Sequence, residues 1–112
     1  MRSGFVRIAS LAEIPEGELR SYEGPAGRIV LAHVEQELFA LADECPADGA
    51  SLGEGALGSQ EDSVICPSDG SEFDLRTGEP VDGPASDPVR VFAVRVDDGG
   101  WVEIGSPTEG GW

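Results

Sequence analysis

Short apolar runs separated by turn residues recur along the whole chain. Their side chains alternate or form brief continuous stretches, which is typical of strands, and none keeps a helical spacing over an ordinary helix length. Polar turns separate the two clearest pairs of runs, at residues 35–36 and 97–100. The runs that predict strands are residues 5–9, 19–22, 27–34, 37–42, 63–65, 71–75, 89–96 and 101–104. The pattern therefore predicts an all-β fold.

The length bounds the organisation of the chain. The 112 residues leave room for one domain with a modest core, and 39% of them are hydrophobic, which is enough to form it. The 16 glycines and 8 prolines supply the frequent turns that short strands need. We expect one domain over residues 1–105, followed by a flexible C-terminal tail over residues 106–112.

Acidic residues dominate the charge. There are 22 of them against 7 basic residues, all arginine, which gives a formal net charge of −15. Nucleic acid is excluded as a partner because its phosphates must be neutralised by cations. The acidic surface either steers a basic protein partner or serves general solubility and salt tolerance, and composition does not separate these two interpretations.

The chain shows no sign of a membrane or export segment. No stretch reaches the roughly 20 apolar residues of a membrane span. The first residues lead into a strand pattern without the apolar centre of a signal peptide. We expect no contact with a membrane and a cytoplasmic location.

Two near copies of one motif carry the candidate chemistry. Residues 45–49 read Cys-Pro-Ala-Asp-Gly and residues 66–70 read Cys-Pro-Ser-Asp-Gly, each directly after an apolar run. The glycine permits a tight turn that can wrap around a ligand, and thiolates and carboxylates are both metal ligands. The candidate cofactor-binding residues are Cys45, Cys66, Asp48 and Asp69.

Catalysis by the chain itself is not favoured. A nucleophilic cysteine needs a base beside it, and the single histidine, His33, lies in an apolar strand run well before either motif. We therefore expect His33 to be an ordinary strand residue and assign no catalytic residue. Carboxylates close together are expected at this composition without forming a catalytic pair.

Over nearly its whole length the chain resembles the Rieske ferredoxin family. The resemblance rests on the two motif loops, the strand and turn behind the second loop, a proline-containing loop and the last hairpin. These segments are residues 38–46, 49–55, 65–67, 70–78, 83–89 and 89–104. The resemblance implies three small antiparallel sheets, with two hairpin loops that hold a [2Fe-2S] cluster. It also implies an electron-transfer component serving a multicomponent oxygenase or a reductase.

The chain departs from the family at the cluster ligands. The family carries C-x-H in the first loop and C-x-x-H in the second, so its two histidine positions fall on Ala47 and Asp69, while Cys45 and Cys66 remain. In a Rieske centre two thiolates hold one iron and two imidazoles hold the other. An ordinary Rieske cluster is therefore not expected.

Three states of the site stay open. In the first state the cluster is absent and the domain is a scaffold, as in small nitrite-reductase subunits. In the second state the two cysteines form a reversible disulfide. In the third state Asp48 and Asp69 replace the imidazoles. In this third state the site would bind a cluster or a single metal ion. A cluster held in this way would have a reduction potential below that of an ordinary Rieske cluster. Substituting Asp43 would leave the site unaffected.

The function expected from the sequence is that of a Rieske-type ferredoxin-like protein with an altered or missing [2Fe-2S] centre. It would act through a protein partner, an oxygenase or reductase subunit with a basic docking surface. A cluster-free structural or regulatory docking module is the alternative. A further alternative is a small-molecule pocket walled by the two motif turns and the proline loop.

Overall fold

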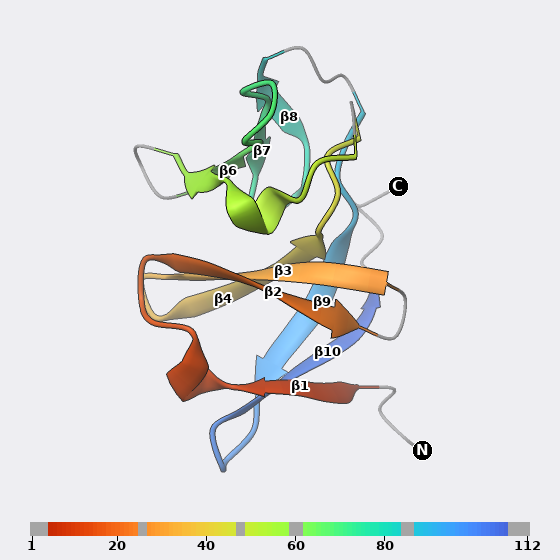
Figure 1. The fold of residues 1–112 in the computed structure, drawn as a ribbon. Coiled ribbons are helices and arrows are strands. Elements are labelled where there is room, and N and C mark those ends of the chain that lie inside the picture. Colours follow the sequence, from red (N-terminus) through yellow and green to blue (C-terminus); the bar gives the residue numbers. More distant parts are fainter. Residues whose placement is uncertain (1–4, 25–26, 47–48, 59–61, 84–86, 108–112) are drawn as a thin grey trace.

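The computed structural model describes the chain in five segments, which contain ten strands and two short 3-10 turns but no α-helix (Figure 1). The described residues are 5–24, 27–46, 49–58, 62–83 and 87–107. The strands are β1 (Val6–Ser10), β2 (Glu18–Gly24), β3 (Gly27–Val34), β4 (Glu37–Ala42), β5 (Ala56–Leu57), β6 (Ser63–Ile65), β7 (Glu72–Asp74), β8 (Pro80–Asp82), β9 (Val91–Val96) and β10 (Trp101–Pro107). The 3-10 turns are η1 (Leu11–Glu13) and η2 (Leu52–Glu54).

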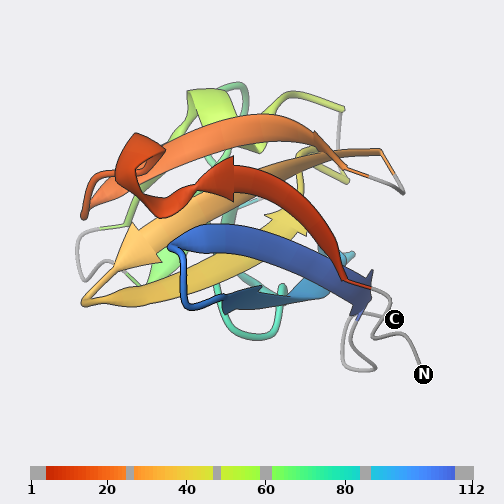
Figure 2. The ribbon, with the colours of Figure 1, turned by 90° about the horizontal axis from the view of Figure 1, so that it is seen from below.

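The strands form two antiparallel sheets. The large sheet has the order β1-β10-β9-β4-β3-β2, and the small sheet has the order β5-β6-β7-β8. Figure 1 shows the small sheet standing over the part of the large sheet formed by β2 and β3. The large sheet curves, as Figure 2 shows from below, so that its edge strands β1 and β2 come close together. The expected all-β class with antiparallel pairing is confirmed.

The number of sheets differs from the expected three. The strands β1, β10 and β9 form one three-stranded group and β4, β3 and β2 form another, as expected for separate small sheets. A short ladder joins the two groups, with Ala40 opposite Phe92 and Leu41 opposite Val91. Because this ladder pairs β4 with β9, the two groups become one six-stranded sheet.

The β3–β4 hairpin has the predicted turn. Its two turn residues, Glu35 and Gln36, have φ values of 53° and 67°. Positive φ at both central positions is the geometry that matches the twist of a two-residue hairpin. The register that follows places Val34 opposite Glu37 and Ile29 opposite Ala42.

Strand β3 divides its side chains between two cores. Val30 and Ala32 pack toward the small sheet, in a cluster that includes Phe73 and that we call the interface core. Ile29 and Leu31 belong to a second cluster, inside the curve of the large sheet. Neighbouring strand residues point to opposite faces, so a strand buried on both faces is apolar at successive positions.

Some elements differ from the expected boundaries. The pattern did not predict β5 or β8, and β9 begins two residues later than expected. Strand β10 continues to Pro107, opposite Phe92, so two residues expected in the tail belong to a strand. Residues 108–112, the rest of the expected tail, lie outside the described part. None of the described residues forms a helix that is long and apolar enough to cross a membrane.

The contact between Gly78, in the turn between β7 and β8, and Val89, just before β9, tests how the small sheet is attached to the large sheet. Gly78 has a φ of 77°, and a Cβ atom there would overlap the carbonyl oxygen of Val89. Its own carbonyl accepts a hydrogen bond from the Val89 amide at 2.7 Å. Gly78→Ala should therefore lower the free energy of unfolding by about 3 kcal/mol in urea titrations, from backbone strain and overpacking together.

Gly17→Ala is the matched control. Gly17 has a similar φ of 84°, and among the described residues no atom lies within 4 Å of its added Cβ. This variant should lower the free energy of unfolding by only about 1 kcal/mol. Equal decreases in the free energy of unfolding of the two variants would show that the close approach of Val89 to Gly78 does not contribute to the effect of the substitution.

Candidate functional site

The first motif forms a closed loop directly after β4. The Cys45 amide donates to the carbonyl of Ala50 at 2.8 Å, and the Gly49 amide donates back to the carbonyl of Cys45 at 2.7 Å. Gly49 has a φ of 81°, a value that L side chains rarely adopt, which explains the glycine at this position.

The second motif forms the same loop between β6 and β7. The Cys66 amide donates to the carbonyl of Ser71 at 2.7 Å, and the Gly70 amide donates to the carbonyl of Cys66 at 3.2 Å. Gly70 has a φ of 79°, close to that of Gly49. The repeated sequence therefore gives the same pair of closing hydrogen bonds and the same glycine conformation in both loops.

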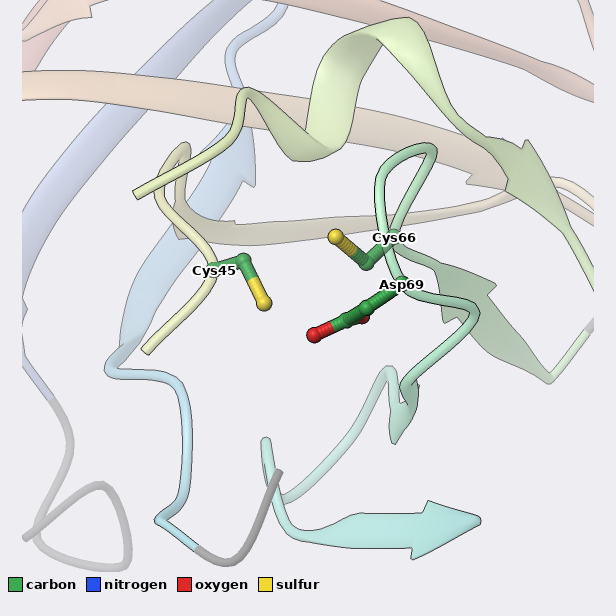
Figure 3. A group of neighbouring side chains, drawn as sticks. All are labelled: Cys45, Cys66 and Asp69. Carbon is green, nitrogen blue, oxygen red and sulfur yellow. The ribbon is translucent and has the colours of Figure 1, made fainter. Parts of the chain in front are cut away.

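The two loops bring three candidate ligands together. The Sγ atoms of Cys45 and Cys66 and a carboxylate oxygen of Asp69 all lie within 4.8 Å of one another. Figure 3 shows the three side chains pointing into the space between the loops. Both cysteines are buried, with exposures of 1% and 2%, and both are reduced thiols. The fourth candidate, Asp48, lies outside the described residues, as does Ala47.

The loop itself holds the Asp69 carboxylate in place. The Ser71 backbone amide donates to its Oδ1 at 2.9 Å, and this hydrogen bond lowers the pKa of Asp69 below its ordinary value. Partial burial acts in the opposite direction, while the Ser71 hydroxyl and the Cys66 thiol lower the pKa further. The carboxylate is therefore an anion at neutral pH, and one of its oxygens lies within 4.8 Å of both thiol sulfurs.

Asp43 has a structural role that the sequence did not reveal, since its substitution was expected to leave the site unaffected. Its carboxylate is buried, accepts from the Ser51 hydroxyl at 2.8 Å and the Gly53 amide at 2.7 Å, and pairs with Arg28 at 3.3 Å. It thus ties the chain on both sides of the first loop to β3. The sequence offered one signal for this role, which is a carboxylate between an apolar strand and a Ser-Leu-Gly segment. This signal is not specific, because many acidic residues of this chain stand beside turns.

His33 lies away from the loops. It stands in β3 opposite Leu38, and its Nδ1 lies 2.6 Å from the carbonyl oxygen of Ile14. It is not among the donors that meet beside the thiols. His33 is therefore a partnered strand residue, as expected from the sequence.

An open cavity of about 940 Å³ lies beside the first loop. Its described lining residues are Gly27, Arg28, Ala42, Asp43, Glu44, Pro46, Gly49, Ser51, Asp87, Pro88, Val89, Arg90 and Phe92. The first motif turn and the end of the proline loop contribute to this lining, but the second motif turn does not. The expected pocket is therefore only partly formed from the walls predicted for it.

Comparison with known proteins agrees with the resemblance inferred from the sequence. The profile of the family described as "Rieske-like [2Fe-2S] domain" matches residues 4–105. A 3-phenylpropionate/cinnamic acid dioxygenase ferredoxin subunit from Photorhabdus laumondii is 37% identical over 92 residues, which cover 82% of this chain and 86% of the relative.

Solved structures share the fold. The complex of reduced oxygenase and oxidized ferredoxin in carbazole 1,9a-dioxygenase contains a chain that matches with a TM-score of 0.84 at 27% identity, covering 96% of this chain and 98% of that chain. The ferredoxin of carbazole 1,9a-dioxygenase from Nocardioides aromaticivorans gives a TM-score of 0.86 at 26% identity, covering 93% and 99%.

The donors present do not fit a Rieske centre. Such a centre needs two thiolates for one iron and two neutral imidazoles for the other. The described residues bring together two thiols and one carboxylate, residue 47 is an alanine, and the chain's single histidine is bonded to Ile14. The thiol half of the ligand set is kept, whereas the imidazole half is replaced.

The part played by Asp43 can be tested by substitution. Asp43→Ala removes the acceptor from the Ser51 hydroxyl and the Gly53 amide, so the free energy of unfolding should fall by about 2–3 kcal/mol. The Cys45 thiol should also react faster with a thiol reagent, because the first loop loses its anchor. Chemical denaturation and thiol-reaction rates measure the two effects.

Glu44→Ala is the control, since Glu44 is the next residue of the same loop and its side chain is exposed. It should change neither stability nor thiol reactivity. If Asp43→Ala behaves like this control, the buried carboxylate does not hold the loop.

Proposed function

This chain belongs to the Rieske-like [2Fe-2S] domain family, and we propose that it serves as a ferredoxin-like component of a multicomponent oxygenase or reductase, with an altered centre at its paired loops. One observation carries the proposal. Both loops keep the thiols and the closing turns, while the two imidazole positions hold Ala47 and Asp69. The scaffold that presents a centre to a partner is thus retained, and only the ligands on one side of that centre have changed.

The change of ligands bears on electron transfer. An anionic carboxylate in place of a neutral imidazole stabilises the oxidised state of an iron centre, so its reduction potential falls below the usual Rieske range. A carrier with such a potential would not accept electrons from the donors that reduce an ordinary Rieske ferredoxin. The role favoured here is therefore that of an auxiliary or docking component.

The surface charge supports a partner with a basic docking face. Five of the six arginines in the described part of the chain are paired with carboxylates of the same chain, so the acidic excess is what an approaching protein meets. The pairs are Arg7–Asp97, Arg20–Glu18, Arg28–Asp43, Arg76–Glu37 and Arg95–Glu103. We place this encounter in the cytoplasm, where thiols such as those of the two loops stay reduced.

The altered centre predicts a spectroscopic result. Protein produced with ample iron and sulfide should lack the visible and electron paramagnetic resonance spectra of a Rieske cluster. Ala47→His combined with Asp69→His should restore two imidazoles and give a partial yield of the cluster, because the loops were closed around shorter side chains. Iron and sulfide content, together with the spectrum of the reduced protein, measure the yield.

The control for size is Ala47→Gln combined with Asp69→Gln, which fills the same positions without imidazole. It should stay colourless. A Rieske spectrum with two nitrogen ligands in the unmodified protein would refute the altered centre, and a colourless but folded double-histidine variant would favour the docking module.

Docking can be measured by competition. In a 3-phenylpropionate dioxygenase assay driven by its own ferredoxin subunit, added chain should inhibit turnover to saturation by occupying the ferredoxin's docking site. The inhibition should weaken by about tenfold between low and high salt, because attraction between exposed charges is screened.

Glu44→Lys, in the first loop, should weaken this inhibition, whereas Glu35→Lys should not. Glu35 is an equally exposed acid in the turn before β4, at the other end of that strand from the loop. No inhibition at a large excess of the chain, or equal loss in the two variants, would count against docking through the loops.

A further inference from the structure

The donors that meet between the loops suit one metal ion. We propose that Cys45, Cys66 and Asp69 bind a single divalent cation of the zinc type, with a fourth coordination position left for water or another ligand. This inference rests on the proposed function, because it names what the altered loops hold in place of a cluster. Two buried thiols and an anionic carboxylate form its donor set.

The spacing of the donors fits a tetrahedral ion. Zinc–sulfur and zinc–oxygen bonds of about 2.3 and 2.0–2.2 Å place neighbouring tetrahedral donors about 3.5–3.8 Å apart. The three donor atoms already lie within 4.8 Å of one another, so an approach of at most about 1.3 Å completes the site. We expect small rotations of the three side chains to close this gap, with the backbone hydrogen bonds of both loops kept.

The position of Asp69 favours one ion over two irons. In a [2Fe-2S] centre the thiolates hold one iron, and the remaining ligands hold the second iron on the far side of the bridging sulfides. A carboxylate oxygen of Asp69 instead lies within 4.8 Å of the Sγ atoms of both cysteines. It thus lies on the thiol side, where it can share an ion with both sulfurs.

The chemistry of binding is balanced by proton release. One divalent cation replaces the protons of two thiols, so two metal–sulfur bonds form and two protons pass to solvent, while the carboxylate contributes its existing charge. Thiolate ligands favour zinc over magnesium or calcium. Burial of both sulfurs also limits competition from water.

The ion would join the two sheets. Cys45 follows β4 of the large sheet, whereas Cys66 and Asp69 belong to the loop between β6 and β7 of the small sheet. A ligand that binds only the folded protein stabilises it, so bound metal should raise the unfolding temperature. This gives a readout that needs neither activity nor a partner.

The test is a titration of reduced, metal-free full-length protein with Co²⁺, followed by displacement with Zn²⁺. We expect one ion per chain, a thiolate-to-cobalt charge-transfer band, a tetrahedral cobalt spectrum, two protons released and a higher unfolding temperature. Cys45→Ser and Cys66→Ser should each abolish or strongly reduce the charge-transfer band. Circular dichroism, with Cys→Ala as a second substitution at each position, checks that these variants fold.

The Asp69→Asn variant distinguishes a role of Asp69 as a metal ligand from a role in holding the turn through the Ser71 amide. Asparagine can still accept from the Ser71 amide, so the metal-free variant should unfold like the parent, yet its affinity for Co²⁺ should fall by at least about tenfold. Asp74→Asn is the matched control, because Asp74 accepts from the Arg76 and Thr77 amides in a comparable turn outside the donor group. It should bind Co²⁺ like the parent.

Several results would overturn the site. They are cobalt binding without the charge-transfer band, no binding, equal affinities in the Asp69→Asn and Asp74→Asn variants, or reconstitution of two irons and two sulfides per chain. The proposed docking role is tested separately. Failure to bind metal with intact competition rejects this inference alone, whereas metal binding without competition rejects the docking role and leaves the site standing.

Discussion

The packing of the small sheet against β3 and β4 is the contact on which the rest of the molecule depends. Side chains of both sheets meet in the interface core, and both cysteines are part of it. Their burial is therefore a consequence of this packing and needs no ligand between the loops. The same contact places the end of β4 beside the β6–β7 hairpin, so that two separate loops share one space.

The hydrogen bonds of the two loops explain how this fold is kept without the family's imidazole ligands. Each loop is closed by backbone bonds between residues at most five positions apart, and the first is also held by the buried carboxylate of Asp43. None of these bonds uses a side chain at the family's histidine positions. Replacing the imidazoles therefore changes the ligands available without removing the supports of the loops.

Much of the fold could be predicted from the sequence, because a strand buried on one or both faces leaves a clear apolar pattern. β3 and β4 are examples, and the turn between them also has a local signature. Strands of two or three residues, such as β5 and β8, carry too little pattern to detect. The pairing of β4 with β9 was missed because it depends on contacts between residues about fifty positions apart.

The candidate site was predicted in part. The repeated motif singled out Cys45, Cys66 and Asp69 as candidate ligands, and the structure places these three side chains close together. It could not show that Asp69 would lie on the thiol side, since this depends on the Ser71 amide that orients its carboxylate. The anchoring role of Asp43 was hidden for a similar reason, because its partners, Ser51 and Gly53, are set by the path of the chain.

The ion pairs described above have a consequence for how the surface charge can be regulated. Every cationic side chain in the 112 residues, histidine aside, is a guanidinium, and the chain contains no lysine. Guanidinium groups keep their proton throughout the physiological range, and acetylation of side-chain amines has no target here. The acidic character of the protein thus does not depend on the protonation of lysine, and enzymes that modify lysine side chains cannot change it.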